Sequence, residues 1–246
     1  MDRLAYLASS GAKQLLLRQD TVAHNLANAN TAGFRADLDA FRAVPVQGAG
    51  PGTRVFVAQT TPGFDSTPGP LQATGRNLDV AIDGEGYFAV QATDGSEAYT
   101  RGGSFDVGAD GVLRTRSGLA VLGDGGPITI PENARVTIGR DGTVSALTGN
   151  DNKNVNVVGR VKLVNTPSTN LAKGGDGLLR TVDGAPAPTD ANVKVVDSML
   201  EGSNVNTVET LVNMIAIARQ FETQMRLISN TDQNARDATK LLASNG

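Results

Sequence analysis

The stretch NVNTVETLVNMIAIARQFETQMRLISNTDQNARDATKLL, residues 204–242, decides the fold because it can form one uninterrupted helix. Neither Gly nor Pro occurs between Ser203 and Ser244, and apolar residues recur at spacings of three and four. Ser203 or Asn204 is expected to cap the start of this helix. At about 1.5 Å per residue the helix is roughly 55 Å long. A rod of that shape cannot bury its own apolar stripe, so it needs a partner.

The apolar positions of this segment form one stripe, which we expect to lie at contacts between subunits. The residues on it are Val208, Leu211, Ile215, Ala218, Met225 and Ile228. Because a long helix exposes such a stripe along its whole length, packing against other helices is the expected way to remove it from water.

A second amphipathic segment runs from Met1 to about Phe34, with small and aliphatic residues at spacings of three, four or seven. Asn, Thr and Gly residues between Asn28 and Gly33 are expected to end its helix. The residues that we expect at subunit contacts are Leu4, Leu15, Val22 and Leu26. Pairing the two terminal helices as a coiled-coil-like unit leaves apolar surface uncovered, so further copies or neighbours are needed.

The middle of the chain consists of short alternating runs, such as Leu78–Ile82, separated by turns. Asp-Gly pairs recur there and predict type I′ hairpins; they begin at Asp83, Asp94, Asp110, Asp124, Asp141, Asp176 and Asp183. This pattern predicts an inserted domain of short antiparallel strands. Ahead of it, the prolines and glycines of residues 43–75 predict an extended arm with short strand pieces such as Val55–Val57.

The predicted fold class is therefore α+β. Residues 1–35 together with 200–246 are expected to form a terminal helical polymerisation domain, residues 36–77 an extended arm or linker, and residues 78–199 an inserted all-β domain.

Composition excludes several classes of function. A net charge of −3 and the lack of a basic cluster argue against a nucleic-acid partner, and no apolar run approaches the length of a membrane span. The chain has no Cys, which excludes disulfides and thiolate metal sites. Met1–Asp20 lacks the continuous apolar region of a secretory signal peptide. The chain is therefore expected to stay in the cytoplasm or to leave by another route.

Candidate catalytic and ligand-binding residues are few, and each has a simpler structural interpretation. His24 is the only histidine and is expected on a helix surface or at an interface. Gly123–Gly126 and Gly174–Gly177 lack the strand, helix and Lys-Ser/Thr context of a phosphate loop and are predicted to be hairpin turns. The acidic residues Asp79, Asp83 and Glu85 are expected to be solvated. We therefore expect no enzyme activity, no metal, no cofactor and no small-molecule substrate.

Two stretches at opposite ends of the chain resemble signatures of the flagellar rod and hook family. The first is carried by Asn25, Leu26, Ala27, Asn28, Thr31, Gly33 and Phe34, and the second by Ser203, Asn204 and Val205 within Leu200–Asn206. The middle is similar to the family at Tyr99–Phe105 and Gly126–Pro131. Within the family, the chain opening, Phe41–Val46 and the modest length resemble the proximal-rod members.

This resemblance implies a structural subunit of the bacterial flagellar basal-body rod, which crosses the periplasm and transmits torque from motor to hook. The implied partners are other rod subunits, further copies of the chain and the flagellar type III export apparatus, which would account for a missing signal peptide. Terminal segments that fold on assembly are also implied. The alternatives are a distal-rod protein of the same family and, from another class, a secreted carbohydrate-binding or hydrolytic β-domain protein.

Overall fold

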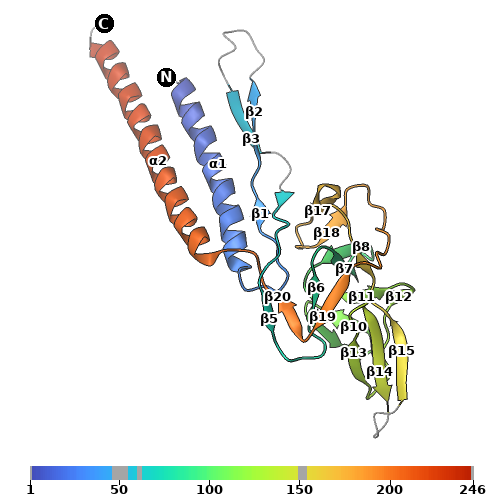
Figure 1. The fold of residues 1–246 in the computed structure, drawn as a ribbon. Coiled ribbons are helices and arrows are strands. Elements are labelled where there is room, and N and C mark those ends of the chain that lie inside the picture. The colour runs from blue at the N-terminus through green and yellow to red at the C-terminus, as the bar shows by residue number, and fades with distance from the viewer. Residues whose placement is uncertain (1, 46–54, 60–62, 149–153, 245–246) are drawn as a thin grey trace. The chain divides into compact units, whose positions relative to one another are not determined.

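The computed structural model describes residues 2–45, 55–59, 63–148 and 154–244 (Figure 1). The chain divides into two compact units. The helical unit comprises Met1–Ala27, Asp37–Gly63 and Asn206–Gly246, and the β unit comprises Asn28–Ala36 and Phe64–Val205. The α+β class predicted from the sequence is confirmed. Residues 36–77 divide between the two units, and the three-part division drawn from the sequence stays a prediction.

The helical unit contains the two long helices and a hairpin. Helix α1 spans Asp2–Ala27 and helix α2 spans Thr207–Ser244, and the two are in contact. Strands β2 (Phe41–Pro45) and β3 (Val55–Gln59) pair in antiparallel fashion, with Phe41 opposite Gln59. A short strand, β1 (Asp37–Leu38), follows α1, and β4 (Gly63–Phe64) lies across the boundary between the units.

Asn206 caps the start of α2. Its side-chain Oδ1 accepts hydrogen bonds from the backbone N–H groups of Val208 at 3.1 Å and Glu209 at 3.2 Å, which is the bonding of an N-cap residue. The expectation that Ser203 or Asn204 caps this helix is therefore wrong. Both residues lie before the helix and use their side chains there: Ser203 Oγ accepts the N–H of Val205 at 3.2 Å, and Asn204 binds residues of the β unit.

The β unit is built almost entirely from antiparallel strands, as the Asp-Gly spacing predicts. Among the described residues, a nine-stranded sheet has the order β17-β18-β8-β7-β11-β10-β9, with β12 on β11 and β16 on β7. A three-stranded sheet has the order β13-β14-β15, and the pairs β19-β6 and β20-β5 complete the unit. The strands are β5 Leu71–Ala73, β6 Val80–Asp83, β7 Tyr87–Gln91, β8 Glu97–Thr100, β9 Phe105–Val107, β10 Leu113–Thr115, β11 Ala120–Gly123, β12 Gly126–Pro127, β13 Arg135–Ile138, β14 Thr143–Thr148, β15 Asn154–Arg160, β16 Leu163–Val164, β17 Leu171–Lys173, β18 Leu179–Thr181, β19 Lys194–Asp197 and β20 Met199–Glu201.

Aliphatic side chains dominate the core of the β unit, with few aromatic rings among them. Phe88 and Phe105 pack edge to face with ring centroids 5.3 Å apart, a favoured aromatic geometry. Around them lie buried aliphatic residues, among them Val80, Leu113, Val121, Val144 and Leu163. The helices contribute their own buried residues, Ala12 and Ile217.

Five of the seven Asp-Gly turns, at Asp94, Asp110, Asp124, Asp141 and Asp176, join strands that pair with each other, but they are not of the predicted type. The turns at Asp83 and Asp183 do not form hairpins, because β6 pairs with β19 and β18 pairs with β17 and β8. A type I′ turn needs positive φ at both central residues, and the only described non-glycine residues with positive φ are Asn133 and Ser198. At Asp94-Gly95 only the glycine is left-handed, at φ 85°. Asp94 Oδ1 accepts the N–H of Ser96 at 2.9 Å, and Ala92 and Ser96 close the hairpin beyond it. This is a type I turn followed by a glycine bulge.

The same turn recurs around Asp110, Asp141 and Asp176, each of which accepts the N–H two residues later. A short polar side chain that bonds to its own backbone in this way stabilises the turn without positive φ at the aspartate. The prediction of type I′ turns was wrong for this reason: an Asp-Gly pair marks a turn, but it determines neither the type of the turn nor whether the flanking strands pair.

These turns make the β unit sensitive to acid. A hydrogen bond from the Ser96 hydroxyl lowers the pKa of Asp94, and one from the Thr143 hydroxyl lowers the pKa of Asp141. Because the folded pKa lies below the unfolded value of about 3.9, this stabilisation is present above pH 4 and is lost as pH falls through the folded pKa. The midpoint temperature of thermal unfolding should change little between pH 7 and 5 and should fall below pH 4. The fall should be smaller for Asp141→Asn. For Glu132→Gln, at an exposed residue, the midpoint temperature should follow that of the unmodified chain at every pH.

Candidate functional site

The less exposed residues of α2 follow a regular spacing. Thr210, Met214, Ile217, Phe221, Gln224, Ile228 and Thr231 are buried or half-buried and alternate at spacings of four and three, the spacing of a coiled-coil seam. Gln224 on this face lies against Gly11 of α1, where an added Cβ would come within 2.9 Å of its amide nitrogen. Small residues such as Gly11 allow this close approach between the helices.

The packing between α1 and α2 is incomplete. Leu15 of α1 and four residues of α2 line an open groove of about 430 Å³. The lining residues on α2 are Arg219, Gln220, Thr223 and Gln224. Four of the five lining residues are polar, but Leu15 and the apolar parts of the other side chains form most of the surface of the groove.

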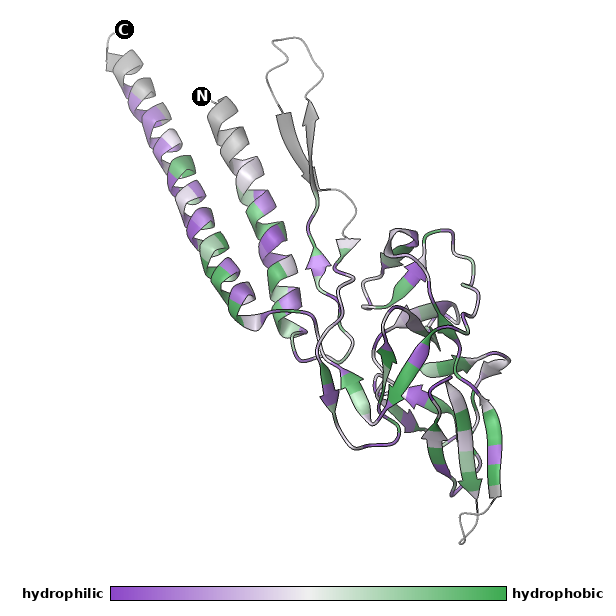
Figure 2. Ribbon diagram, in the orientation of Figure 1, coloured by the Kyte–Doolittle hydropathy of each residue, from purple (hydrophilic) through white to green (hydrophobic). Residues whose placement is uncertain are grey.

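A second face of α2 carries apolar residues that remain in contact with water (Figure 2). Val208 is 70% exposed, Ile215 55% and Leu211 47%, and Met225, Val212 and Leu227 are also exposed. At 100° per residue, Ile215 and the buried Ile217 lie 200° apart around the helix. Of the residues predicted at subunit contacts, Val208, Leu211 and Ile215 thus point away from the buried face. Met225 is 46% exposed but lies 40° from Phe221 around the helix, so it borders the buried face. Ala218 and Ile228 are half-buried.

The predicted contact residues of α1 are less exposed than those of α2. Leu15, Val22 and Leu26 are half-buried, and Leu16 is 46% exposed. Leu4 belongs to α1, but its side chain lies outside the part of the chain that the structure describes.

The last turns of α1 are tied to the segment that follows the helix. Asn25 bonds twice to the backbone of Asp37: its amide nitrogen donates to the carbonyl at 3.0 Å, and its amide oxygen accepts the N–H at 2.8 Å. His24 Nδ1 lies 2.5 Å from the Asp37 carboxylate, and the Thr21 hydroxyl donates to Asp39 at 2.7 Å. The lone histidine therefore serves a structural contact at the end of the helix.

The two signature segments meet inside the β unit. The N–H of Gly33 donates to the carbonyl of Glu201 at 2.8 Å, and the N–H of Asn204 donates to the carbonyl of Phe34 at 3.3 Å. The Asn204 side chain accepts the N–H of Ala36 at 2.7 Å and donates to the carbonyl of Asp65 at 3.0 Å. Asn204 thus joins three separate stretches of the chain. Asparagine suits this position because its side-chain amide both donates and accepts hydrogen bonds, which neither a hydrophobic side chain nor an ionised one can do.

Only glycine fits at position 33, because the backbone there passes close to the backbone of Arg101. Its φ is +70°, in the left-handed region that favours glycine. A Cβ at this position would lie 2.2 Å from the backbone carbon of Arg101. Nearby, Asn28 accepts a backbone hydrogen bond from Thr31 at 3.1 Å and a side-chain one at 3.2 Å, so the signature shapes the turn that follows Ala27, the last residue of α1.

A buried ion cluster centred on Glu201 lies at this junction. The Glu201 side chain is fully buried, and Arg35 and Arg101 approach its two oxygens at 2.8 Å and 2.6 Å. The N–H of Gly69 also donates to Glu201 at 2.9 Å, and Arg101 donates to the carbonyl of Gly86 at 2.7 Å. Burial lowers the pKa of Arg35, and the Glu201 charge opposes that shift. Because arginine stays protonated in proteins, the cluster holds two cations and one anion away from water.

Phe34 and Val205 flank the cluster. Phe34 is buried, and the Lys173 ammonium lies 3.8 Å from its ring centroid, a cation–π distance. Lys173 also donates to the carbonyl of Arg35 at 2.7 Å. Val205 is half-buried and directly precedes Asn206, so the junction leads into the start of α2 as well as away from the end of α1.

Sequence reasoning missed Arg35, Arg101 and Glu201 as a group. Each lies inside or beside a quoted signature, but a charged residue in a single sequence carries no sign of burial. Asp79 shows the same limit: it was expected to be solvated, yet it is buried and accepts a hydrogen bond from the Ser104 hydroxyl at 2.9 Å.

Among the described helices, none combines the length and apolar composition needed to cross a bilayer.

Comparisons with known proteins match three stretches of the chain. The family profiles are a flagella basal body rod protein at residues 6–35, the flagellar hook protein FlgE/F/G D1 domain at 81–146, and the flagellar basal body rod FlgEFG protein C-terminal at 196–241. Flagellar basal-body rod protein FlgF of Salmonella typhimurium is 47% identical over 99% of both chains. The protein of the same name from Caulobacter vibrioides is 39% identical over 98% of both.

Flagellar basal-body rod protein FlgG of Bacillus subtilis is similar at a lower level, 32% identity over 98% of this chain and 99% of the relative. These relatives do not favour the alternative of a distal-rod protein, nor that of a secreted carbohydrate-binding or hydrolytic protein. The chain belongs to the flagellar basal-body rod protein family and is a structural subunit of that rod.

Proposed function

We propose that this subunit lies in the proximal rod, polymerises through α1 and α2, and transmits torque from the motor to the hook without any enzymatic step. The observation that carries the proposal is the exposed apolar face of α2, at Val208, Leu211 and Ile215. Leaving large aliphatic side chains in water costs about 1.5–3 kcal/mol each relative to burial. A subunit of a multi-subunit rod can recover that free energy by packing this face against its neighbours.

In this proposal α1 and α2 pair as a coiled-coil-like unit along the seam that contains Ile217 and Phe221. The neighbours are other rod subunits and further copies of this chain, and the Pro/Gly-rich arm adds lateral contacts. The chain reaches the rod, across the periplasm, through the flagellar type III export apparatus. Neither cofactor nor metal nor small-molecule substrate takes part. Seam residues such as Thr210 and Gln224 are polar, which fixes register at some cost in stability.

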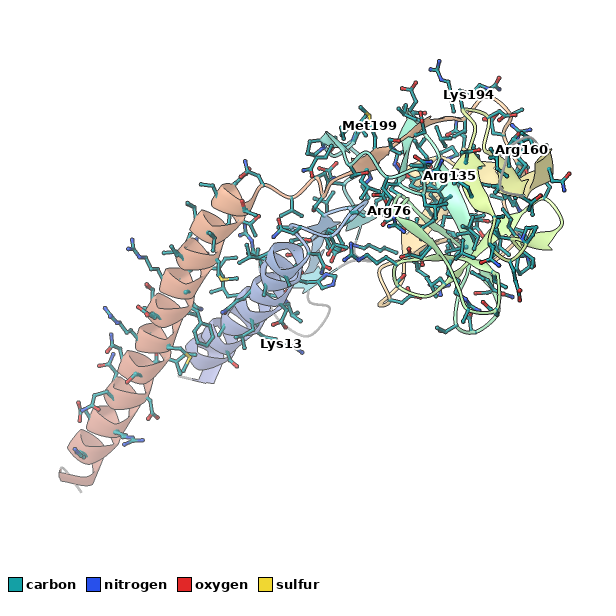
Figure 3. The ribbon with its side chains drawn as sticks, turned by 90° about the horizontal axis from the view of Figure 1, so that it is seen from below. Lys13, Arg76, Arg135, Arg160, Lys194 and Met199 are labelled. Atoms are coloured by element: carbon teal, nitrogen blue, oxygen red, sulfur yellow. The ribbon has the colours of Figure 1, made fainter. Side chains whose placement is uncertain are left out.

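The test compares the purified full chain with a variant lacking residues 2–27, which removes α1 and leaves residues 28–36 of the β unit intact. Isolated amphipathic helices are marginal in water, so we expect the helix content of the full chain, measured by circular dichroism, to rise with concentration together with its sedimentation coefficient. The deletion variant should show neither rise, while its β unit still unfolds cooperatively. Lys13→Ala, on the exposed surface of α1 (Figure 3), is the matched control. A dilute monomer that is fully helical and never associates would contradict the proposal.

A further inference from the structure

The three-stranded sheet of the β unit has one face that packs on the core and one that does not. In the cross-strand register, Val136 lies opposite Ala146 and Ile138 opposite Val144, and these four residues are buried. The neighbouring rows point the other way, because successive side chains alternate between the two faces of a strand. The outer face is formed by Arg135, Thr137, Ser145, Leu147, Val155 and Val157.

This outer face is apolar on the side of β15. Val155 is 59% exposed and Val157 is 69% exposed, and β15 is an edge strand of its sheet. Edge strands in soluble proteins are usually protected by charges, prolines or a covering segment, and Val155-Asn156-Val157 offers none of the first two. Arg135, which is labelled in Figure 3, belongs to β13 at the opposite edge of the sheet and gives the face one exposed positive charge.

Half of this face lies outside the family profiles. The FlgE/F/G domain profile ends at residue 146 and the C-terminal profile begins at residue 196. Leu147, Val155 and Val157 fall between them, whereas Arg135, Thr137 and Ser145 lie within the first. The apolar side of the face is therefore the part suited to distinguish this subunit from other rod and hook subunits.

A complementary feature occurs on the turn that follows β18. The N–H of Gly184 donates to the carbonyl of Thr181 at 3.1 Å and closes this turn. Val182, at its tip, is 70% exposed, and Asp183 beside it is also exposed. Within the described part of the chain, neither Asp183 nor Arg135 takes part in an ion pair. The turn thus presents an apolar side chain next to a carboxylate that accepts the N–H of Ala185 at 3.2 Å but has no cationic partner among the described residues.

The turn and the sheet face lie at opposite ends of the β unit, as β18 and the β13-β14-β15 sheet show in Figure 1. Two different, complementary surfaces at opposite ends of one body produce a contact that repeats from copy to copy without closing. We propose that the Thr181–Gly184 turn of one copy docks on the outer face of the β13-β14-β15 sheet of the next copy. Val182 packs against Val155 and Val157, and Asp183 pairs with Arg135.

This inference rests on the proposed function, because it takes neighbouring copies in the rod as given. The apolar part removes three exposed valines from water, and the ion pair sets the register of the contact. Charge pairs at the rim of an interface select partners more than they add affinity. A copy that carries the turn without Asp183 should therefore bind the sheet face less selectively.

Cysteine pairing provides the direct test, since the chain contains no Cys. Val157→Cys and Val182→Cys are introduced into separate full-length chains, which are expressed together, and isolated basal bodies are oxidised. We expect a disulfide-linked dimer from the mixture and none from either variant alone. Val107→Cys, at a 39% exposed position on β9, replaces Val182→Cys in the control mixture and should give no dimer. Rods that contain both variants but yield no dimer would overturn the proposal.

A charge exchange gives a second measurement that does not depend on assembled rods. Arg135→Glu and Asp183→Arg should each weaken self-association of the purified full chain about fivefold, and the double variant should restore it to within about twofold. A double variant no better than the single ones would refute this pairing. If helix variants abolish association while these variants leave it unchanged, the proposed function stands and this contact fails.

Discussion

Replacing Glu201 with Gln should destabilise the β unit by about 3–5 kcal/mol, the range measured when one partner is removed from a buried ion pair. Glu201 is fully buried and carries the only negative charge of its cluster among the contacts described, facing Arg35 and Arg101. Glutamine keeps the shape but loses the charge. It would leave two buried guanidinium groups without a counter-ion, and its amide N–H₂ would face their N–H donors.

The measurement is urea unfolding of the full chain, followed by circular dichroism in the strand region. Asp83→Asn is the matched control, because Asp83 forms an ion pair with Arg140 at 3.9 Å while both side chains are mostly exposed to water. Pairs near the surface contribute about 1 kcal/mol or less, so the control should lose far less stability. A loss below about 1 kcal/mol for Glu201→Gln would mean that water or rearrangement compensates the cluster.

The position of the cluster explains why such a change should also affect assembly. Residues 28–36 follow α1 and residues 203–205 precede α2, and hydrogen bonds beside the cluster join these two segments within the β unit. Loosening the cluster should free both connecting segments even where the strands remain folded. Variants that replace all three charged residues with apolar ones can recover stability, so comparing their stability with their rod incorporation separates folding from positioning.

The sequence was sufficient to predict the helices and the strand-rich middle, because apolar spacing and turn residues report directly on local structure. It was not sufficient to identify which face of α2 packs on α1. The seam includes Thr210, Gln224 and Thr231, so a search for apolar residues alone selects the other face, at Leu211 and Ile215. Apolar residues recur at helical spacing on both faces of α2. Which of the two faces packs on α1 depends on the residues of α1, and the sequence of α2 does not contain that information.

The sequence was also not sufficient to predict which charged residues are buried. Glu201 and Asp79 are buried, whereas Asp83 and Glu85 are exposed, although nothing in their types or spacing separates the two pairs. Burial of a carboxylate depends on guanidinium and backbone donors that come from distant parts of the chain. Arg101 reaches Glu201 across a separation of 100 residues. The family resemblance located these segments without revealing the ion pairs that join them.

Replacing Ile215 with Asp should block assembly of the rod while leaving the β unit folded. Ile215 lies on the exposed face of α2 and belongs to the helical unit, so its loss removes nothing from the core of the monomer. In the proposed assembly that face is buried against neighbouring subunits, and a carboxylate there would be desolvated without a partner. Such a charge costs several kcal/mol, and about 3 kcal/mol already weakens association more than 100-fold.

Asn213→Asp is the control, because Asn213 is exposed and lies 200° from Ile215 around the helix, away from the apolar face. Asn, Ile and Asp have similar helix propensities, so the two variants place the same charge on α2 at a similar cost to the helix itself. If a charge anywhere on α2 blocked assembly, the two variants would behave alike. We expect Asn213→Asp cells to swim and Ile215→Asp cells to lack complete rods, scored by motility and by electron microscopy of basal bodies. Normal rods that contain the Ile215→Asp subunit would show that this face of α2 is not a subunit contact.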